Sequence, residues 1–353
     1  MKAEISSPLD NKTVEQLGNF APRRFLRNGH LQTLAGNFLP RKLSLPEAEH
    51  LLVEVEGPLS GYGPSRVLCH SHWQPEELRR EALTVVIVHG LEGSSNSQYV
   101  LGNAARALSA GFNVVRMNMR SCGGTDELSP TIYHSGRSED VAAVVRTLVE
   151  HRGIDSIALL GYSMGANLVL KYAGEIAANP PAAIKAVVGI SPLMDLAASS
   201  SALHEVQNRI YEWHFLRSML ARVRRKAALF PKIYTTENLD KIRTMRLFDE
   251  HVVARYGGFS GADDYYYSVA SSQYARQFNL PTLIVHSVDD PFIRMLPSTR
   301  AALVANPGVT YIETTHGGHC AFLAAANGDD GRWAETTLLR FLIEQTNGSR
   351  LGR

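Results

Sequence analysis

The feature that most constrains this chain is a short motif between an apolar run and a helix-forming segment. Residues 157–160 are Ile-Ala-Leu-Leu, residues 161–165 are Gly-Tyr-Ser-Met-Gly, and a helix-like composition follows. A Gly-x-Ser-x-Gly motif between a strand and a helix holds its serine on a sharp turn at the end of a sheet. The two glycines let the strand and helix backbones pass closely. We therefore predict that Ser163 is a nucleophile; an ordinary structural turn is the alternative.

Strand and helix patterns alternate along most of the chain, which is typical of βαβ units and a mostly parallel sheet flanked by helices. Two early runs alternate in a way that suits antiparallel edge strands. We expect the edge strands at residues 51–55 and 66–70, further strands at residues 84–88, 112–117, 156–160, 186–190, 282–285 and 309–312, and helices at residues 97–108, 140–150 and 333–344.

The alternation stops between residues 196 and 277, where helical, charged and aromatic segments replace strands. We interpret residues 196–277 as a helical cap inserted between the sixth and seventh expected strands. The α/β core would then comprise residues 49–195 and 278–353, after an N-terminal extension of residues 1–48. The basic run at residues 217–226 is typical of a solvated helix face, and contact with anionic lipid is the alternative. Trp213 and the tyrosines at residues 265–267 either line an apolar acyl pocket or pack inside the cap.

The composition is that of a soluble globular protein, with 44% hydrophobic and 20% charged residues. A net charge of +2 gives no reason to expect a nucleic-acid partner. Cys69, Cys122 and Cys320 are too few and too scattered for a disulfide framework, so a reducing cytoplasm is the simplest location. The sequence has neither a signal-peptide pattern nor an apolar stretch of about 20 residues. We expect no transmembrane segment; peripheral membrane contact and the oligomeric state stay open.

A nucleophilic serine requires a base, and the base requires an acid that orients it. On this kind of sheet the acid and then the base follow later strands of the chain. Asp289 and Asp290 both follow the strand expected at residues 282–285. We favour Asp290 because the residue before a proline is biased toward extended backbone, and Asp289 remains the alternative. Asp195 is a weaker candidate, and we interpret it as a helix cap.

The base is expected after the last strand, where the sequence is Thr-His-Gly-Gly-His at residues 315–319. Two glycines before His319 let the backbone approach closely, so we favour His319 over His316. His70 and His72 share a strand face, but no third metal ligand has suitable spacing. We therefore expect no metal, and the proposed chemistry needs no organic cofactor.

Acyl transfer also needs hydrogen-bond donors for the oxyanion that forms on the substrate carbonyl. Residues 89–93, His-Gly-Leu-Glu-Gly, directly follow the strand at residues 84–88, where such a loop belongs. The backbone N–H groups of Leu91 and Met164 are the candidates, and the helix after Ser163 adds positive potential. A glycine-rich turn without this role is the alternative. A phosphate-binding loop is not expected because no Gly-Lys-Ser/Thr follows.

Further motifs resemble the YheT-like branch of the α/β-hydrolase superfamily, which is similar to the eukaryotic abhydrolase-domain lipases and esterases. Besides the segments above, they are Arg-Asn-Gly-His-Leu-Gln-Thr at residues 27–33, Tyr-His-Ser-Gly at residues 133–136, Glu-Asp at residues 139–140, Phe-Asp-Glu at residues 248–250, Gly-Phe at residues 258–259 and Gly-Gly-His-Cys-Ala-Phe at residues 317–322. The resemblance runs from about residue 25 to residue 343. It departs at residues 120–124, Arg-Ser-Cys-Gly-Gly, where relatives resemble Arg-Gly-x-x-Gly; we expect this to alter at most the edge of the pocket and to touch no proposed catalytic group.

The resemblance implies an α/β-hydrolase fold and a triad of Ser163, Asp290 and His319. We expect a serine esterase that cleaves small-molecule or lipid esters with an apolar acyl chain through an acyl-enzyme. A thioesterase, an amidase or an acyltransferase would use the same triad, and a non-catalytic binding protein would keep only the fold. The sequence does not indicate the natural substrate or the preferred chain length.

Overall fold

A mostly parallel nine-stranded sheet forms the centre of the protein in the computed structural model, which describes residues 4–6, 20–41, 43–56, 61–326 and 330–351. The strand order is β1-β9-β8-β7-β6-β4-β5-β3-β2. The strands are β1 (Glu4–Ser6), β2 (Glu49–Val55), β3 (Ser65–His72), β4 (Thr84–Val88), β5 (Asn113–Met117), β6 (Ile157–Tyr162), β7 (Ile184–Ile190), β8 (Thr282–Ser287) and β9 (Val309–Thr314). β4 to β9 pair in parallel, whereas β1, β2 and β3 pair antiparallel with their neighbours.

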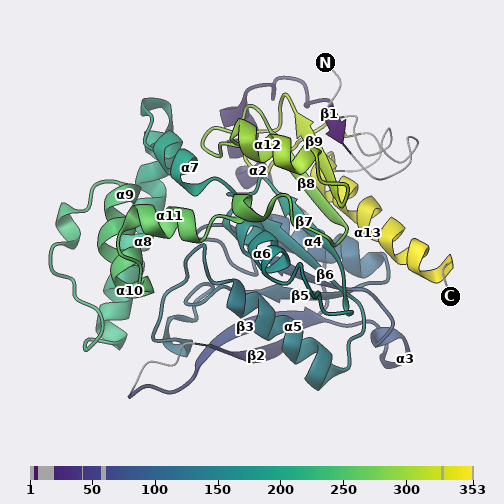
Figure 1. Ribbon diagram of the computed structural model, residues 1–353, viewed down its shortest axis with the longest axis horizontal. Coiled ribbons are helices and arrows are strands. Elements are labelled where there is room, and N and C mark those ends of the chain that lie inside the picture. Colours follow the sequence, from purple (N-terminus) through teal and green to yellow (C-terminus); the bar gives the residue numbers. More distant parts are fainter. Residues whose placement is uncertain (1–3, 7–19, 42, 57–60, 327–329, 352–353) are drawn as a thin grey trace.

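Helices cover both faces of this sheet (Figure 1). The principal ones are α2 (Gly29–Phe38), α3 (Glu76–Arg79), α4 (Gln98–Ser109), α5 (Ser138–Arg152), α6 (Met164–Glu175), α12 (Pro297–Val304) and α13 (Trp333–Leu351). One apolar core joins the sheet to α5, α6 and α12, and a second joins its other face to α4 and α13. Val86 and Val88 belong to the first core and Val85 and Ile87 to the second, because successive side chains of a strand point to opposite faces. The expected α/β-hydrolase fold is confirmed.

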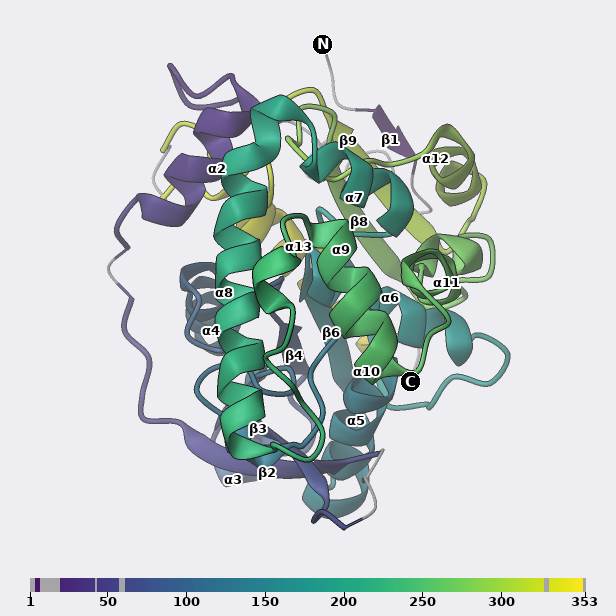
Figure 2. The same ribbon diagram turned by 90° about the vertical axis from the view of Figure 1, so that its left-hand side faces the viewer.

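A separate group of helices lies beside the sheet, at the left of Figure 1, and Figure 2 views this group from the front. It comprises α7 (Leu196–Leu203), α8 (Arg209–Leu229), α9 (Met245–Phe248), the π-helical segment η4 (Asp249–Ala254), α10 (Arg255–Gly257) and α11 (Ala262–Ser268), with short 3₁₀ turns between them. These helices share a third apolar core. They come between β7 and β8 in the chain, within the segment that we interpret as an inserted cap.

The N-terminal region contains two elements that the sequence patterns did not predict. β1 pairs with β9 at one edge of the sheet, and α2 lies close to the start of α8 (Figure 2). His30 on α2 stacks on Tyr211 of α8, with ring centroids 5.7 Å apart. Most of residues 1–19 lie outside the described part of the chain. Among the described residues, no helix has the length and apolar character that crossing a membrane requires.

Candidate active site

Ser163 lies on a strained turn between β6 and α6. Its backbone angles are φ 54° and ψ −116°, a region that a residue with a side chain adopts only at an energetic cost. A Cβ at Gly161 would lie 2.3 Å from the carbonyl oxygen of Gly165, and a Cβ at Gly165 would lie 2.4 Å from that of His89. Both distances are far too short for a methyl group. The motif therefore has glycine at both positions because the strand, the helix and the neighbouring loop nearly touch.

Asp290 and His319 meet at the ends of β8 and β9. His319 Nδ1 lies 2.8 Å from Asp290 Oδ2, and the side chain of Asp290 is completely buried. The backbone N–H groups of Phe292 and Ile293 donate to Asp290 Oδ1 at 3.1 Å and 2.9 Å. Burial alone would raise the pKa of Asp290, but His319, His286 and the Ile293 N–H outweigh it and hold the pKa below its usual value. An ionised Asp290 makes His319 Nδ1 the donor and leaves Nε2 as the basic atom.

Asp289 and His316, the alternatives that the sequence left open, make different contacts. Asp289 Oδ1 accepts hydrogen bonds from the Gly318 N–H at 2.9 Å and from the Ser287 hydroxyl. Its other oxygen lies 3.4 Å from Nδ1 of His316, a side chain that is 38% exposed. This geometry makes Asp289 a support for the loop that carries His319.

Ser163 and His319 are not joined by a hydrogen bond in this structure. Within the described chain, Ser163 Oγ makes no hydrogen bond, and the contact of His319 Nε2 is with Cys320 Sγ at 3.5 Å. Such bonds in free enzymes are often long and tighten when substrate binds. Burial lowers the pKa of His319, but Cys320 and the Asp290 carboxylate outweigh it and raise the pKa well above its usual value. In this structure the Asp290 carboxylate thus stabilises the protonated form of His319, while Ser163 and His319 do not form a hydrogen bond.

The two expected oxyanion donors are available. Neither the Leu91 N–H nor the Met164 N–H donates a hydrogen bond to any described residue. The loop before Leu91 is held by His89, whose Nδ1 lies 2.8 Å from the Gly90 carbonyl and whose Nε2 accepts from the Met119 N–H at 3.1 Å. Burial lowers the pKa of His89 to about 4, so this imidazole is neutral and structural.

The same loop is tied to the cap through a buried ion pair that the sequence patterns did not reveal. Glu92 lies 3.0 Å from Nη2 of Arg222 on α8, and each side chain is only 9% exposed. The Tyr133 hydroxyl donates to Glu92 Oε1 at 2.6 Å, and Ser218 of α8 donates to Oε2. Lys226 is also buried, with its ammonium group bonded to backbone carbonyls. The basic run is therefore only partly a solvated face, because two of its cations point into the protein.

An apolar cavity opens beside Ser163, between the sheet and the cap. It is lined mainly by aliphatic and aromatic side chains, including Leu91, Met164, Leu196, Phe215, Met219, Tyr265, Tyr266 and Phe292. Tyr265 and Tyr266 thus line the pocket as one sequence interpretation proposed, whereas Tyr267 and Trp213 are 70% and 58% exposed. Phe292 packs against His319 with ring centroids 4.5 Å apart and the rings tilted by 50°, which connects the cavity to the imidazole.

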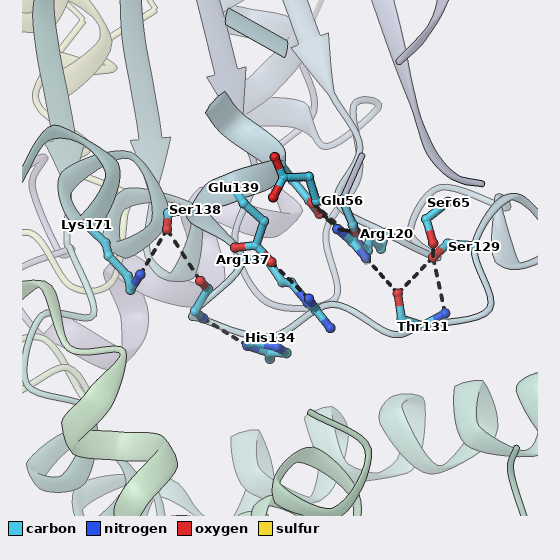
Figure 3. Close-up of polar contacts among 12 residues, drawn as sticks. Glu56, Ser65, Arg120, Ser129, Thr131, His134, Arg137, Ser138, Glu139 and Lys171 are labelled. Carbon is cyan, nitrogen blue, oxygen red and sulfur yellow. Dashed lines mark hydrogen bonds and ion pairs between the residues drawn. The ribbon is translucent and has the colours of Figure 1, made fainter. Parts of the chain in front are cut away.

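His134 and Ser135 line this cavity, and the polar network behind their segment is drawn in Figure 3. Arg120 is completely buried there, donates to Asp140 through Nε at 2.7 Å and reaches Thr131 at 2.8 Å. Arg120 belongs to the segment that departs from the family pattern. As expected, its contacts reach no member of the proposed triad. They hold in place the loop with His134 and Ser135, which borders the pocket.

Two weaker sequence candidates have structural contacts. Asp195 precedes α7 but does not cap it; its carboxylate accepts from the Leu296 N–H and the Thr299 hydroxyl at the start of α12, both at 2.9 Å. His70 bonds to Ser95, and His72 lies 3.2 Å from an Arg116 nitrogen, a neighbour that disfavours a bound cation. No cluster of potential metal ligands occurs among the residues described.

The sheet topology and the serine turn are those of an α/β hydrolase. The family model for the alpha/beta hydrolase fold matches residues 84–326, so the chain belongs to the α/β-hydrolase family.

Two comparisons extend this result. The chain is 29% identical over 333 residues to the putative esterase YheT of Escherichia coli, which covers 93% of this chain and 94% of that protein. It is 26% identical over 267 residues to a monoacylglycerol lipase of Saccharomyces cerevisiae, with coverage of 73% and 58%. The expected similarity to the YheT-like branch is confirmed. The solved structure of the esterase Pf2001 of Pyrococcus furiosus aligns with this chain at a TM-score of 0.54 and 15% sequence identity. The alignment covers 87% of this chain and 98% of Pf2001, and it supports the fold.

Proposed function

We propose that this chain is a serine esterase that hydrolyses carboxylic esters through an acyl-enzyme, with Ser163, Asp290 and His319 as its triad. The observation that carries the proposal is the ionised Asp290 bonded to His319 at 2.8 Å. Phe292, which packs against His319, lines the same cavity as the strained Ser163. The free N–H groups of Leu91 and Met164 supply the remaining requirement, donors for an oxyanion. The names of the relatives, an esterase and a lipase, agree with this chemistry.

In the proposed reaction, His319 Nε2 takes the proton of Ser163 while the serine oxygen attacks the ester carbonyl. Asp290 stabilises the imidazolium that results, and the two backbone N–H groups stabilise the oxyanion. His319 then protonates the leaving alcohol. Water, deprotonated by the same imidazole, attacks the acyl-enzyme and releases the acid. For these steps His319 must leave the Cys320 sulfur and approach Ser163.

The lining of the cavity favours an ester with an apolar portion. Whether that ester is a small molecule or a lipid remains a prediction, as does peripheral contact with a membrane. The outer face of α8 is the surface available for such contact, because Ile210 and Trp213 are exposed there beside Arg217.

The proposal is tested by labelling the purified protein with a fluorophosphonate probe, which reacts with activated serines. We expect labelling and hydrolysis of 4-nitrophenyl esters, and loss of both in Ser163→Ala. Ser121→Ala is a matched control: this buried serine also has a positive φ, 61°, but its hydroxyl donates to the Thr131 carbonyl and contacts no member of the triad. Absence of labelling in well-folded protein would favour a non-catalytic binding protein. Labelling with faster turnover of thioesters or amides would instead reassign the leaving group.

A further inference from the structure

The cavity beside Ser163 contains a buried carboxyl group that the proposed reaction does not use. Asp249 lines this cavity and is only 7% exposed. It belongs to the Phe-Asp-Glu motif at residues 248–250. Phe248 is buried in the core of the cap, and Glu250 accepts from the Ala262 N–H at the start of α11, so both of these residues have structural roles. Asp249 is the member of the motif that faces the cavity.

The burial of Asp249 is only partly compensated, by the Tyr266 hydroxyl and the charge of Arg246. Among the described residues, it forms no ion pair, and its Oδ1 atom accepts no hydrogen bond. Its Oδ2 atom accepts from the Tyr266 hydroxyl at 2.7 Å, and Ser200 Oγ lies 2.8 Å from the same hydroxyl. Burial raises the pKa of Asp249 to about 7. A buried carboxyl with an unused oxygen is costly unless something else satisfies it.

The position of this group in the backbone is also unusual. Asp249 begins η4, a π-helical segment between α9 and α10. Single π-helical turns are rare and occur often at functional sites, because they turn a side chain out of the regular helical register. Met245 and Val253, on the same stretch of helix, contribute apolar side chains to the cavity. A polar group is therefore presented within an otherwise apolar wall.

We propose that Asp249, Tyr266 and Ser200 form a polar subsite that binds a hydroxyl group carried by the apolar ester substrate. The proposal rests on the esterase function proposed above. A hydroxyl group both donates and accepts, so it satisfies Asp249 whether the carboxyl is protonated or ionised. A plain alkyl chain would leave the free oxygen unsatisfied in an apolar wall. The hydroxyl lies either on the acyl chain or on the alcohol portion of the ester; the chemistry at Asp249 is the same.

The test is a kinetic comparison of matched esters with the full-length protein. One arm compares 4-nitrophenyl octanoate with a series of 4-nitrophenyl hydroxyoctanoates, which carry the hydroxyl on the acyl chain. The second arm compares propyl octanoate with 1-octanoylglycerol, which carries hydroxyls on the alcohol portion. In one arm we expect kcat/KM to favour a hydroxyl-bearing ester by about 10- to 100-fold, as for a hydrogen bond to a charged or buried partner.

Variants assign this preference to the subsite. Asp249→Leu should abolish the preference while the alkyl ester remains a substrate, and Tyr266→Phe should reduce it. Asp249→Asn keeps hydrogen-bonding atoms and should keep part of the preference. Asp240→Leu is the matched control, because this acid lies in the same cap but is exposed to solvent. It should leave the preference unchanged.

The failures of the two proposals are distinguishable. If the wild-type protein is labelled at Ser163 and hydrolyses both members of each pair equally, the subsite is refuted and the esterase stands. A preference for aminoalkyl esters over hydroxyl-bearing ones would also refute it, in favour of a cation site. If Ser163 is not labelled and no ester is cleaved, the esterase function itself fails.

Discussion

Removing Arg222 should destabilise the protein strongly, because this residue is the buried partner of Glu92. Both side chains are 9% exposed and the charged atoms lie 3.0 Å apart. Charge centres about 4 Å apart attract by roughly 4 kcal/mol at an effective dielectric constant of about 20. Breaking a buried pair by removing one partner costs about 3–5 kcal/mol, since it leaves an uncompensated charge. Tyr133 and Ser218 still donate to Glu92, so we expect Arg222→Met to lower the free energy of unfolding by about 3 kcal/mol.

The assay is urea unfolding followed by fluorescence, with a double-mutant cycle. Glu92→Gln should cost less than Arg222→Met, because Arg222 keeps Asp126 at 3.7 Å as a second acid. The double variant should cost less than the sum of the single ones, with a coupling of about 1–3 kcal/mol.

Arg225→Met is the control for this cycle. Arg225 lies on the same helix and pairs with Asp126 at 2.9 Å, but its side chain is 51% exposed. Such half-exposed pairs contribute about 0–1 kcal/mol. Equal losses for Arg222→Met and Arg225→Met, or additive losses in the cycle, would refute the claim that the buried pair joins the cap to the loop at Glu92.

Three further outcomes follow from the site. Asp290→Asn should lower kcat on a 4-nitrophenyl ester by on the order of 10⁴, the loss measured for the serine-protease aspartate, while Asp289→Asn should cost far less; equal losses would reject Asp290 as the acid. Esterase activity should fall as pH drops through the pKa of His319, which is raised by its neighbours. In Asp290→Asn the residual activity should extend to lower pH, because the carboxylate no longer stabilises the imidazolium. A pH–rate profile without this shift would contradict the pairing of Asp290 with His319. Gly165→Ala should destabilise the protein by about 1–3 kcal/mol or more and abolish activity, because the new methyl would lie 2.4 Å from the His89 carbonyl oxygen; an unchanged melting temperature would show that the turn relaxes freely.

The sequence patterns predicted most of the sheet but placed the ends of some strands too early. The strand expected at residues 282–285 continues to Ser287, and all six of its residues are buried. Its last two, His286 and Ser287, are polar, because the carboxyl ends of parallel strands carry the groups that approach a site. An apolar pattern therefore ends before the strand does. β1 has only the three residues Glu4–Ser6, too few for any alternation to be recognised.

Parts of the candidate site can be proposed from the sequence where the pattern is local, but not where they depend on distant packing. Ser163 and His319 follow from short motifs beside strands, and those motifs need no knowledge of the rest of the fold. The pair of Arg222 and Glu92 joins residues 130 positions apart, so no local pattern connects them. One signal was available: Arg222 and Lys226 share a helical face with the buried Met219 and Val223, which a solvated basic face would not do.

The positive φ of Ser163 has a consequence for any attempt to improve this protein. Glycine adopts a φ of 54° without the steric cost that serine bears, so Ser163→Gly should relieve part of that cost, on the order of 1 kcal/mol. Selection for thermal stability alone would then favour loss of the proposed nucleophile. Directed evolution of this chain for thermostability therefore requires an activity screen at every round, because the most stable variants would include inactive ones.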